Sequence, residues 1–249
     1  MERVQYGRTP LRVSRLCWGT GLMGRLKHNM TPEEAARILW RGYELGVNFW
    51  DTADGYGTHP HVRAALQPLP RKDIVINTKT PAKTFEQAEQ DVRRYLQELG
   101  TEYIDSILLH GIETVEELQN RWGAMEALLR AKEAGLVRAV GISTHLGTGA
   151  IMEACATRPE IEVVLTTVNK DGLMLKGDMA AHLKLVEQVY QAGKGVCLMK
   201  TLAQGKYVSS PRECIQYNLS LPFAHSVCVG VNSIEEVEFA VDVARPVPV

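Results

Sequence analysis

The sequence has no long apolar run, no block of like charges and few cysteines. Its 249 residues carry a formal net charge of -1, without the basic cluster that nucleic-acid binding requires. No hydrophobic stretch is long enough to span a bilayer, and residues 1–15 lack the apolar core of a secretory signal. We therefore expect a cytoplasmic protein whose partner is a small molecule, with no nucleic acid and no membrane. Nothing in the pattern predicts an oligomeric state.

The cysteines are dispersed, and their spacing matches neither a metal site nor a disulfide framework. Three of them lie in apolar runs that are typical of strands. We interpret all of them as small buried hydrophobic residues. They are Cys17, Cys155, Cys197, Cys214 and Cys228.

Short apolar runs alternate with longer helical patterns along the whole chain. Strands separated by helices pair in parallel, because a crossover helix returns the chain to the same end of the sheet. Eight such units predict an α/β fold, the (β/α)8 or TIM barrel. No linker or composition shift divides the chain, so we expect one domain over residues 1–249. The predicted strands are residues 14–18, 47–50, 73–77, 103–109, 137–142, 163–168, 195–199 and 226–229.

Local signals punctuate this pattern. Residues 7–10 predict a hairpin turn before the first barrel strand, and residues 169–178 predict a loop. Four helix starts place Glu or Gln three positions after a hydroxyl residue, the spacing of a capping box: Thr31, Thr84, Thr114 and Ser233. Three helices are predicted to end at a left-handed glycine: Gly46, Gly100 and Gly135.

Residues 19–24, Gly-Thr-Gly-Leu-Met-Gly, match the glycine fingerprint of dinucleotide-binding open sheets. In that motif the helix begins within the glycine turn, so that its N-terminus meets the pyrophosphate. Here the helix start at Thr31 and Pro32 comes about a turn and a half too late. We therefore favour the barrel over the open sheet. The glycines are interpreted as letting a loop approach a ligand closely.

Titratable residues end three consecutive predicted strands. Asp51 closes the second, Lys79 follows the third and His110 follows the fourth, while Tyr56 lies in the loop after the second. In a barrel these side chains converge at the C-terminal mouth, where barrel enzymes place their chemistry. Each one separately is more often a rim charge or a hydrogen-bonded core residue. Together they favour a site that protonates and orients a carbonyl group.

Several segments resemble the aldo-keto reductases: residues 6–14, the stretch around Asp51 and Tyr56, Asn77-Thr78-Lys79, residues 100–110 and residues 140–143. The resemblance covers nearly the whole chain. It implies a barrel with an N-terminal β-hairpin closing the bottom and a nicotinamide cofactor at the mouth. It also implies that Tyr56 is the general acid, that Asp51 pairs with Lys79, and that a neutral His110 positions the carbonyl.

Lys79 is then expected to make Tyr56 a better proton donor. An unperturbed phenol has a pKa of about 10. An ammonium group about 4 Å away, at an effective dielectric constant of about 20, could lower that pKa by up to roughly three before Asp51 offsets part of the effect.

The resemblance further implies cofactor contacts, although the sequence departs from the commoner family pattern. Ser143 and Thr144 replace a Ser-Asn pair that holds the carboxamide, and Met199 replaces a stacking aromatic residue. Thr166 and Thr167 lie near the place of an absent glutamine. The predicted cofactor contacts are Gly19, Thr20, Gly21, Ser143, Thr144, Met199, Lys200, Thr201, Leu202, Gly205, Gly230, Asn232, Ser233 and Glu236.

No Lys or Arg lies between Gly230 and Ala244, where relatives bind the adenosine phosphate. Recognition of a 2′-phosphate normally uses such charges. NADP(H) is favoured by the resemblance, and NAD(H) remains the alternative.

The predicted substrate is a small aldehyde or ketone, with an imine as the alternative. The chain ends at Val249, shortly after the last predicted helix, so we expect an open mouth lined by Trp18 and Met23. Trp50, inside a strand, is expected in the core. A second hypothesis is a nicotinamide-nucleotide-binding regulatory or redox-sensing barrel with little turnover, because fold does not fix function. The four polar residues favour an NAD(P)H-dependent carbonyl reductase.

Overall fold

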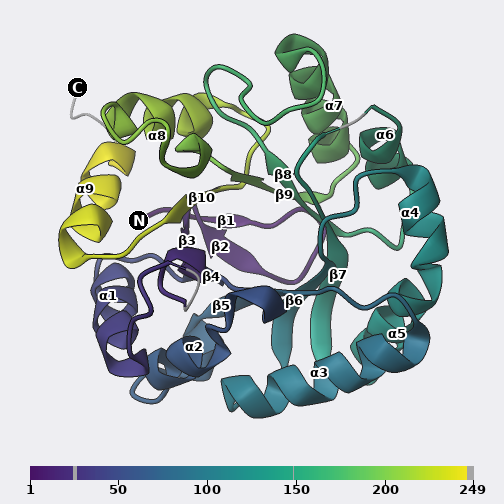
Figure 1. The fold of residues 1–249 in the computed structure, drawn as a ribbon, viewed down its shortest axis with the longest axis horizontal. Helices are drawn as coiled ribbons and strands as arrows, with labels where there is room; N and C mark the ends of the chain where they lie inside the picture. The colour runs from purple at the N-terminus through teal and green to yellow at the C-terminus, as the bar shows by residue number, and fades with distance from the viewer. Residues whose placement is uncertain (25–26, 148, 246–249) are drawn as a thin grey trace.

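Eight parallel strands close into a barrel in the order β10-β3-β4-β5-β6-β7-β8-β9, surrounded by helices (Figure 1). The computed structural model describes residues 1–24, 27–147 and 149–245. Closure confirms the predicted TIM barrel and is incompatible with the open sheet. The barrel strands are β3 (Leu16–Gly19), β4 (Phe49–Asp51), β5 (Val75–Thr80), β6 (Ile104–Leu109), β7 (Val137–Thr144), β8 (Val163–Thr167), β9 (Gly195–Met199) and β10 (Ser226–Gly230).

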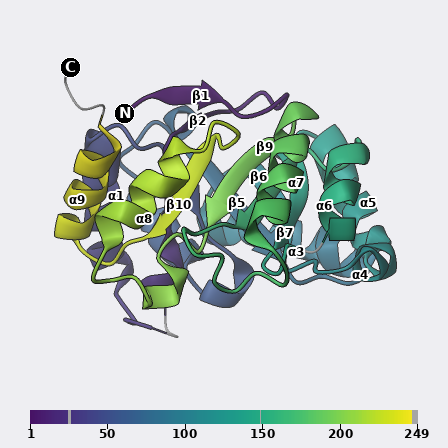
Figure 2. The ribbon, with the colours of Figure 1, turned by 90° about the horizontal axis from the view of Figure 1, so that it is seen from above.

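A two-stranded antiparallel hairpin, β1 (Arg3–Gln5) and β2 (Arg12–Ser14), precedes the barrel. It lies across one end of the barrel, opposite the long loops that follow the strands (Figure 2). Tyr6 from its turn is 1% exposed and packs into the barrel interior. The hairpin therefore plugs the N-terminal end, as predicted, and leaves the C-terminal end as the mouth.

The helices are α1 (Pro32–Glu44), α2 (His59–Leu66), α3 (Phe85–Leu99), α4 (Val115–Asn120), α5 (Trp122–Glu133), α6 (Gly149–Thr157), α7 (Met179–Gln191), α8 (Pro211–Ser220) and α9 (Ile234–Ala244). Short 3-10 turns are η1 (Thr20–Leu22), η2 (Asp54–Tyr56), η3 (Arg71–Asp73) and η4 (Ala203–Gly205). None of these helices, within the residues that the structure describes, is long and apolar enough to cross a membrane.

All four predicted capping hydroxyls accept a backbone hydrogen bond from the residue three positions on. Only at Thr31 does the acid return the bond to the capping residue. At the other three helices the Glu or Gln side chain accepts from the backbone N–H of the residue before the capping residue, as when Glu236 accepts from Asn232 at 2.8 Å. The three predicted glycine stops have positive φ, which confirms them: Gly46, Gly100 and Gly135.

Side chains on the strands alternate between the barrel interior and an outer layer under the helices, because successive residues point to opposite faces. Cys17 and Phe49 lie in the interior, whereas Trp18 and Trp50 lie in the outer layer. Trp50 is therefore a core residue, as predicted. All the cysteines are buried free thiols, which confirms that they act as small hydrophobic residues.

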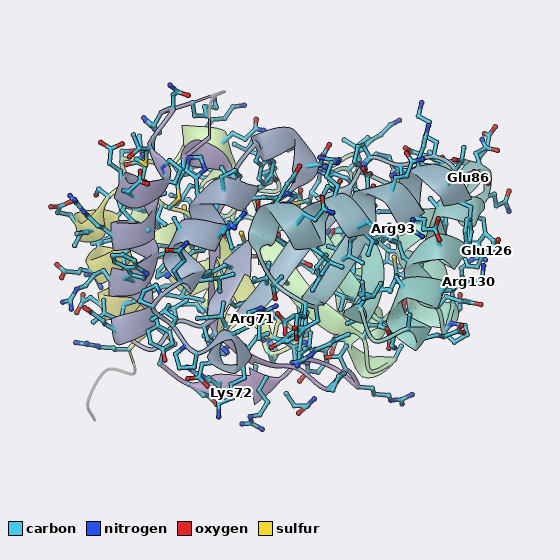
Figure 3. The ribbon with its side chains drawn as sticks, turned by 90° about the horizontal axis from the view of Figure 1, so that it is seen from below. Arg71, Lys72, Glu86, Arg93, Glu126 and Arg130 are labelled. Atoms are coloured by element: carbon cyan, nitrogen blue, oxygen red, sulfur yellow. The ribbon has the colours of Figure 1, made fainter. Side chains whose placement is uncertain are left out.

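Charged side chains cover the outer surface. In Figure 3, Arg93 on α3 and Arg130 on α5 extend from the outer faces of their helices, while Arg71 and Lys72 lie at the hairpin end. A cavity lined by Arg71, Arg63 and Tyr103 lies at that end. This cavity is remote from the strand ends that carry the polar residues. The candidate active site is therefore at the mouth and not in this cavity.

Candidate active site

A buried ion pair lies at the mouth between neighbouring strands. The inward face of β4 runs from Phe49 to Asp51, and that of β5 runs from Val75 to Lys79. Lys79 Nζ lies 2.7 Å from Asp51 Oδ1 and 2.8 Å from Oδ2. The lysine is 1% exposed. Burial lowers its pKa, but the charge and hydrogen bonds of Asp51, together with Tyr56, outweigh burial and raise the pKa above the ordinary value, so Lys79 stays charged.

Tyr56 sits above this pair on the turn η2. Its ring centroid lies 5.0 Å from Lys79 Nζ. Lys79 is the strongest influence on the Tyr56 pKa and lowers it, as predicted. Burial and Asp51 together raise that pKa further than Lys79 lowers it, so the net direction is above the ordinary value. The expected net lowering is wrong, because the same burial that brings the charges together also disfavours phenolate.

His110 faces Tyr56 from the end of β6. The two rings are 6.1 Å apart and nearly perpendicular, at 87°. Burial, followed by the nearby charge of Lys79, lowers the pKa of His110 to about 3. The imidazole is therefore neutral at neutral pH, as predicted. The structure thus brings together Tyr56 and the three titratable residues at the strand ends.

Asn77 is a fifth member of this cluster, and the sequence reasoning did not assign it a role. Its Nδ2 donates to Asp51 Oδ1 at 2.6 Å, and its backbone oxygen accepts from the N–H of Thr52 at 2.8 Å. Asn77 precedes Lys79 by two positions on β5, so both side chains point inward. This spacing of two along a strand is the sequence feature that could have identified Asn77 as a neighbour of Lys79.

The glycine fingerprint packs against the Tyr56 turn. A Cβ atom on Gly21 would lie 3.4 Å from the Tyr56 ring. Thr20 Oγ1 donates to the backbone oxygen of Asp51 at 3.1 Å and shares a hydrogen bond with Thr58 Oγ1 at 2.8 Å. Close approach is indeed why small residues occur here, but at Gly21 the neighbour is the protein's own tyrosine rather than a ligand.

The two hydroxyls predicted to hold a carboxamide are already bonded within the protein. Ser143 Oγ accepts from the N–H of Gly111 at 2.9 Å, and Thr144 Oγ1 donates to Glu113 at 3.0 Å. Ser143 retains its own proton for a ligand. Thr167, which follows the inward Leu165 by two positions on β8, has a buried hydroxyl without a partner among the described residues. An unsatisfied polar group at the mouth is what a bound carboxamide would complete.

The segment after β9 places a partly buried cation, Lys200, next to Met199. Met199 points inward at 6% exposure, and Lys200 adopts a positive φ of 60°. Burial lowers the pKa of Lys200. Thr201 is 1% exposed, and its hydroxyl donates to the backbone oxygen of Cys228 at 3.0 Å. Leu202 and Gly205 follow in the loop with η4, where Gly205 has a positive φ.

The adjacent side of the mouth is formed by β10, which pairs with β9, and by α9. Gly230 pairs in register with Gly19. Ser233 Oγ accepts from the N–H of Glu236 at 3.2 Å, so these predicted phosphate contacts also cap α9. Asn232 and Ser233 are half-buried and Glu236 is exposed. A carboxylate at this point disfavours a neighbouring phosphate.

The prediction that Trp18 and Met23 line the substrate pocket is wrong. Both side chains are fully buried in the outer layer. Trp18 faces α1 so closely that a Cβ atom on Gly42 would lie 2.0 Å from its Nε1. For Trp18 the alternation of side chains along β3 decides this, since Cys17 rather than Trp18 faces the barrel interior.

A tyrosine, a buried lysine–carboxylate pair and a neutral histidine lie together at the mouth of a TIM barrel, which is the arrangement that the resemblance to the aldo-keto reductases implies. The comparison with known families agrees: the Aldo/keto reductase family matches residues 15–218. The chain belongs to this family.

The chain matches known relatives at low sequence identity. A putative aldo-keto reductase structure from Pseudomonas aeruginosa superposes with a TM-score of 0.83 at 25% identity, covering 97% of this chain and 94% of that one. The uncharacterized oxidoreductase YqkF of Bacillus subtilis is 25% identical, covering 98% of this chain and 92% of that protein. An aldo-keto reductase of Mycolicibacterium smegmatis is 32% identical over 45% of this chain. The matched region spans 41% of that relative's length.

Proposed function

We propose that the protein is an NAD(P)H-dependent reductase of small aldehydes and ketones, working as one domain. The observation that carries this proposal is the buried Lys79–Asp51 pair beneath the ring of Tyr56, with neutral His110 beside it. If Lys79 were an ordinary charge on the solvent-exposed rim of the barrel, its ammonium group would not be fully buried.

Tyr56 is the proton donor. Its raised pKa keeps the phenol protonated at neutral pH, as a general acid must be. When the proton moves to the carbonyl oxygen, the phenolate that forms is stabilised by the charge of Lys79. Asp51 and the backbone oxygen of Thr52, the latter at 2.7 Å, prevent the ammonium group from turning away. The charge is therefore fixed in place before the reaction.

His110 orients the substrate. A neutral imidazole at right angles to the Tyr56 ring can donate a hydrogen bond to the same carbonyl oxygen without adding a competing charge. Lys79 already makes this part of the mouth positive, so protonating His110 would be unfavourable, in keeping with its lowered pKa.

The residues at the mouth fit a nicotinamide dinucleotide. The unpartnered hydroxyl of Thr167 and the remaining donor of Ser143 suit a carboxamide, and Met199 offers an apolar surface for the ring. Lys200 can face the pyrophosphate. When bound, the reduced cofactor supplies the hydride. Family resemblance favours NADPH, while the carboxylate of Glu236 and the lack of Lys or Arg in residues 230–244 favour NADH.

The decisive experiment measures the loss of absorbance as NADPH or NADH is oxidised in the presence of a panel of aldehydes, ketones and quinones. We expect carbonyl-dependent oxidation of at least one cofactor. Dissociation constants for both cofactors come from quenching of Trp fluorescence. Tight nucleotide binding without turnover on any acceptor would refute the reductase and support the sensing barrel.

A further inference from the structure

Glu113 and His145 form a second polar cluster at the mouth, on the loops that follow β6 and β7. Glu113 accepts hydrogen bonds from the backbone N–H groups of His145 and Leu146, each at 2.8 Å. It also accepts from Thr144 Oγ1. One carboxylate therefore fixes the start of the loop after β7.

The same carboxylate fixes the ring of His145. Its Oε1 lies 3.2 Å from His145 Nδ1. Burial raises the pKa of Glu113, but hydrogen bonds from His145 and Leu146 outweigh it and bring the pKa to about 2. Glu113 is thus an acceptor at neutral pH, which makes Nδ1 the donor. In the tautomer with the proton on Nδ1, the lone pair of the ring lies on Nε2.

His145 lies beside the residue that orients the carbonyl. The ring centroids of His145 and His110 are 6.0 Å apart, with a tilt of 36°. Gly111 lies in the loop after β6, and a Cβ atom there would lie 4.0 Å from His145 Nδ1. The His145 side chain is 29% exposed, so part of its ring remains free for a ligand.

We propose that His145 is a specificity residue that selects carbonyl substrates bearing a hydroxyl group on the adjacent carbon. This inference rests on the proposed reductase function. His110 holds the carbonyl oxygen, and Nε2 of His145 accepts a hydrogen bond from the neighbouring hydroxyl. Glu113 is a positioning residue that selects the tautomer. Because Trp18 and Met23 are fully buried, neither supplies the apolar lining that would favour a purely aliphatic substrate.

The test compares two nearly isosteric aldehydes, glycolaldehyde and propanal. In the wild type, kcat/KM should favour glycolaldehyde, and in His145→Phe the ratio of the two kcat/KM values should fall about tenfold, the effect of one hydrogen bond. The propanal value and the KM for the cofactor should not change. His145→Asn, which restores a side-chain acceptor, should recover part of the ratio, and thermal unfolding of each variant confirms its fold.

Three outcomes would overturn the inference. An unchanged ratio in His145→Phe would show that the ring does not contact the hydroxyl. An equal fall for both aldehydes would place His145 with the reacting carbonyl, and a raised cofactor KM would place it with the nucleotide. Turnover of propanal in these cases leaves the reductase itself standing, whereas no turnover with any carbonyl refutes both proposals.

Discussion

Gly24 lies directly against the backbone of Tyr56, so that a Cβ atom at position 24 would come within 2.1 Å of the Tyr56 carbonyl oxygen. That oxygen belongs to the turn η2, which carries the phenol. Gly24 therefore helps to determine the position of Tyr56, the proposed proton donor, although Gly24 itself has no functional group.

Gly24→Ala is expected to displace this turn and lower kcat by at least about tenfold, because small misplacements of a reacting group are costly. Gly55→Ala is the matched control, since nothing lies within 4 Å of the added methyl group. Steady-state kinetics on both variants provides the measurement. Equal rates in the two would show that the turn adapts freely.

Tyr56→Phe should keep the fold and the cofactor affinity but lower kcat by roughly 10²- to 10⁴-fold, because it removes the proton donor alone. Tyr43→Phe, which loses a hydrogen bond to Asp73 at 3.2 Å away from the site, controls for the loss of a phenol. The rate of NAD(P)H oxidation and the nucleotide dissociation constant are measured for each. Near-normal turnover in Tyr56→Phe would remove this residue from the mechanism.

Lys79→Met should destabilise the protein by about 3–5 kcal/mol, because it leaves Asp51 as an unpaired buried charge. The double variant Asp51→Asn/Lys79→Met should regain much of that loss while staying inactive. Lys132→Met, at a partly exposed pair with Glu162, should cost no more than about 1 kcal/mol. Urea unfolding tests all three, and a Lys79→Met variant as stable as Lys132→Met would contradict the burial argument.

Glu236→Gln should tighten NADPH binding a few-fold and leave NADH binding nearly unchanged. The substitution removes a negative charge near the expected 2′-phosphate, and the amide oxygen can still accept from the N–H of Asn232. Glu133→Gln on α5 is the charge-matched control. Titration of Trp fluorescence gives the dissociation constants. An identical NADPH constant in both variants would place the phosphate elsewhere.

Acid should destabilise the fold through its neutral imidazoles. Burial lowers the pKa of His110 to about 3 and, with Arg15, that of His225 to about 4. An unfolded histidine binds a proton below about pH 6.5, so the unfolded state binds more protons between about pH 6.5 and pH 3, and stability must fall as pH falls. The urea midpoint should be lower at pH 5 than at pH 7.5. Equal midpoints would show that these groups titrate normally.

The sequence alone determined the architecture, because its signals are local and repeated. Apolar runs, crossover helices, capping hydroxyls and glycine stops indicate the eight strand–helix units of a (β/α)8 barrel, although several strand bounds differ by two or three residues. The ends of consecutive parallel strands must meet at one mouth, so Asp51, Lys79 and His110 could be placed together before any coordinate was known.

Only the tertiary structure decided which way the other side chains face and how their charges balance. A one-residue parity turned Trp18 outward, and chain segments far apart in sequence brought Asn77 to Asp51 and Glu113 to His145. The pKa of Tyr56 depends on burial as well as on Lys79. Burial and distance are sums over many non-local contacts, and for that reason no spacing along the chain encodes them.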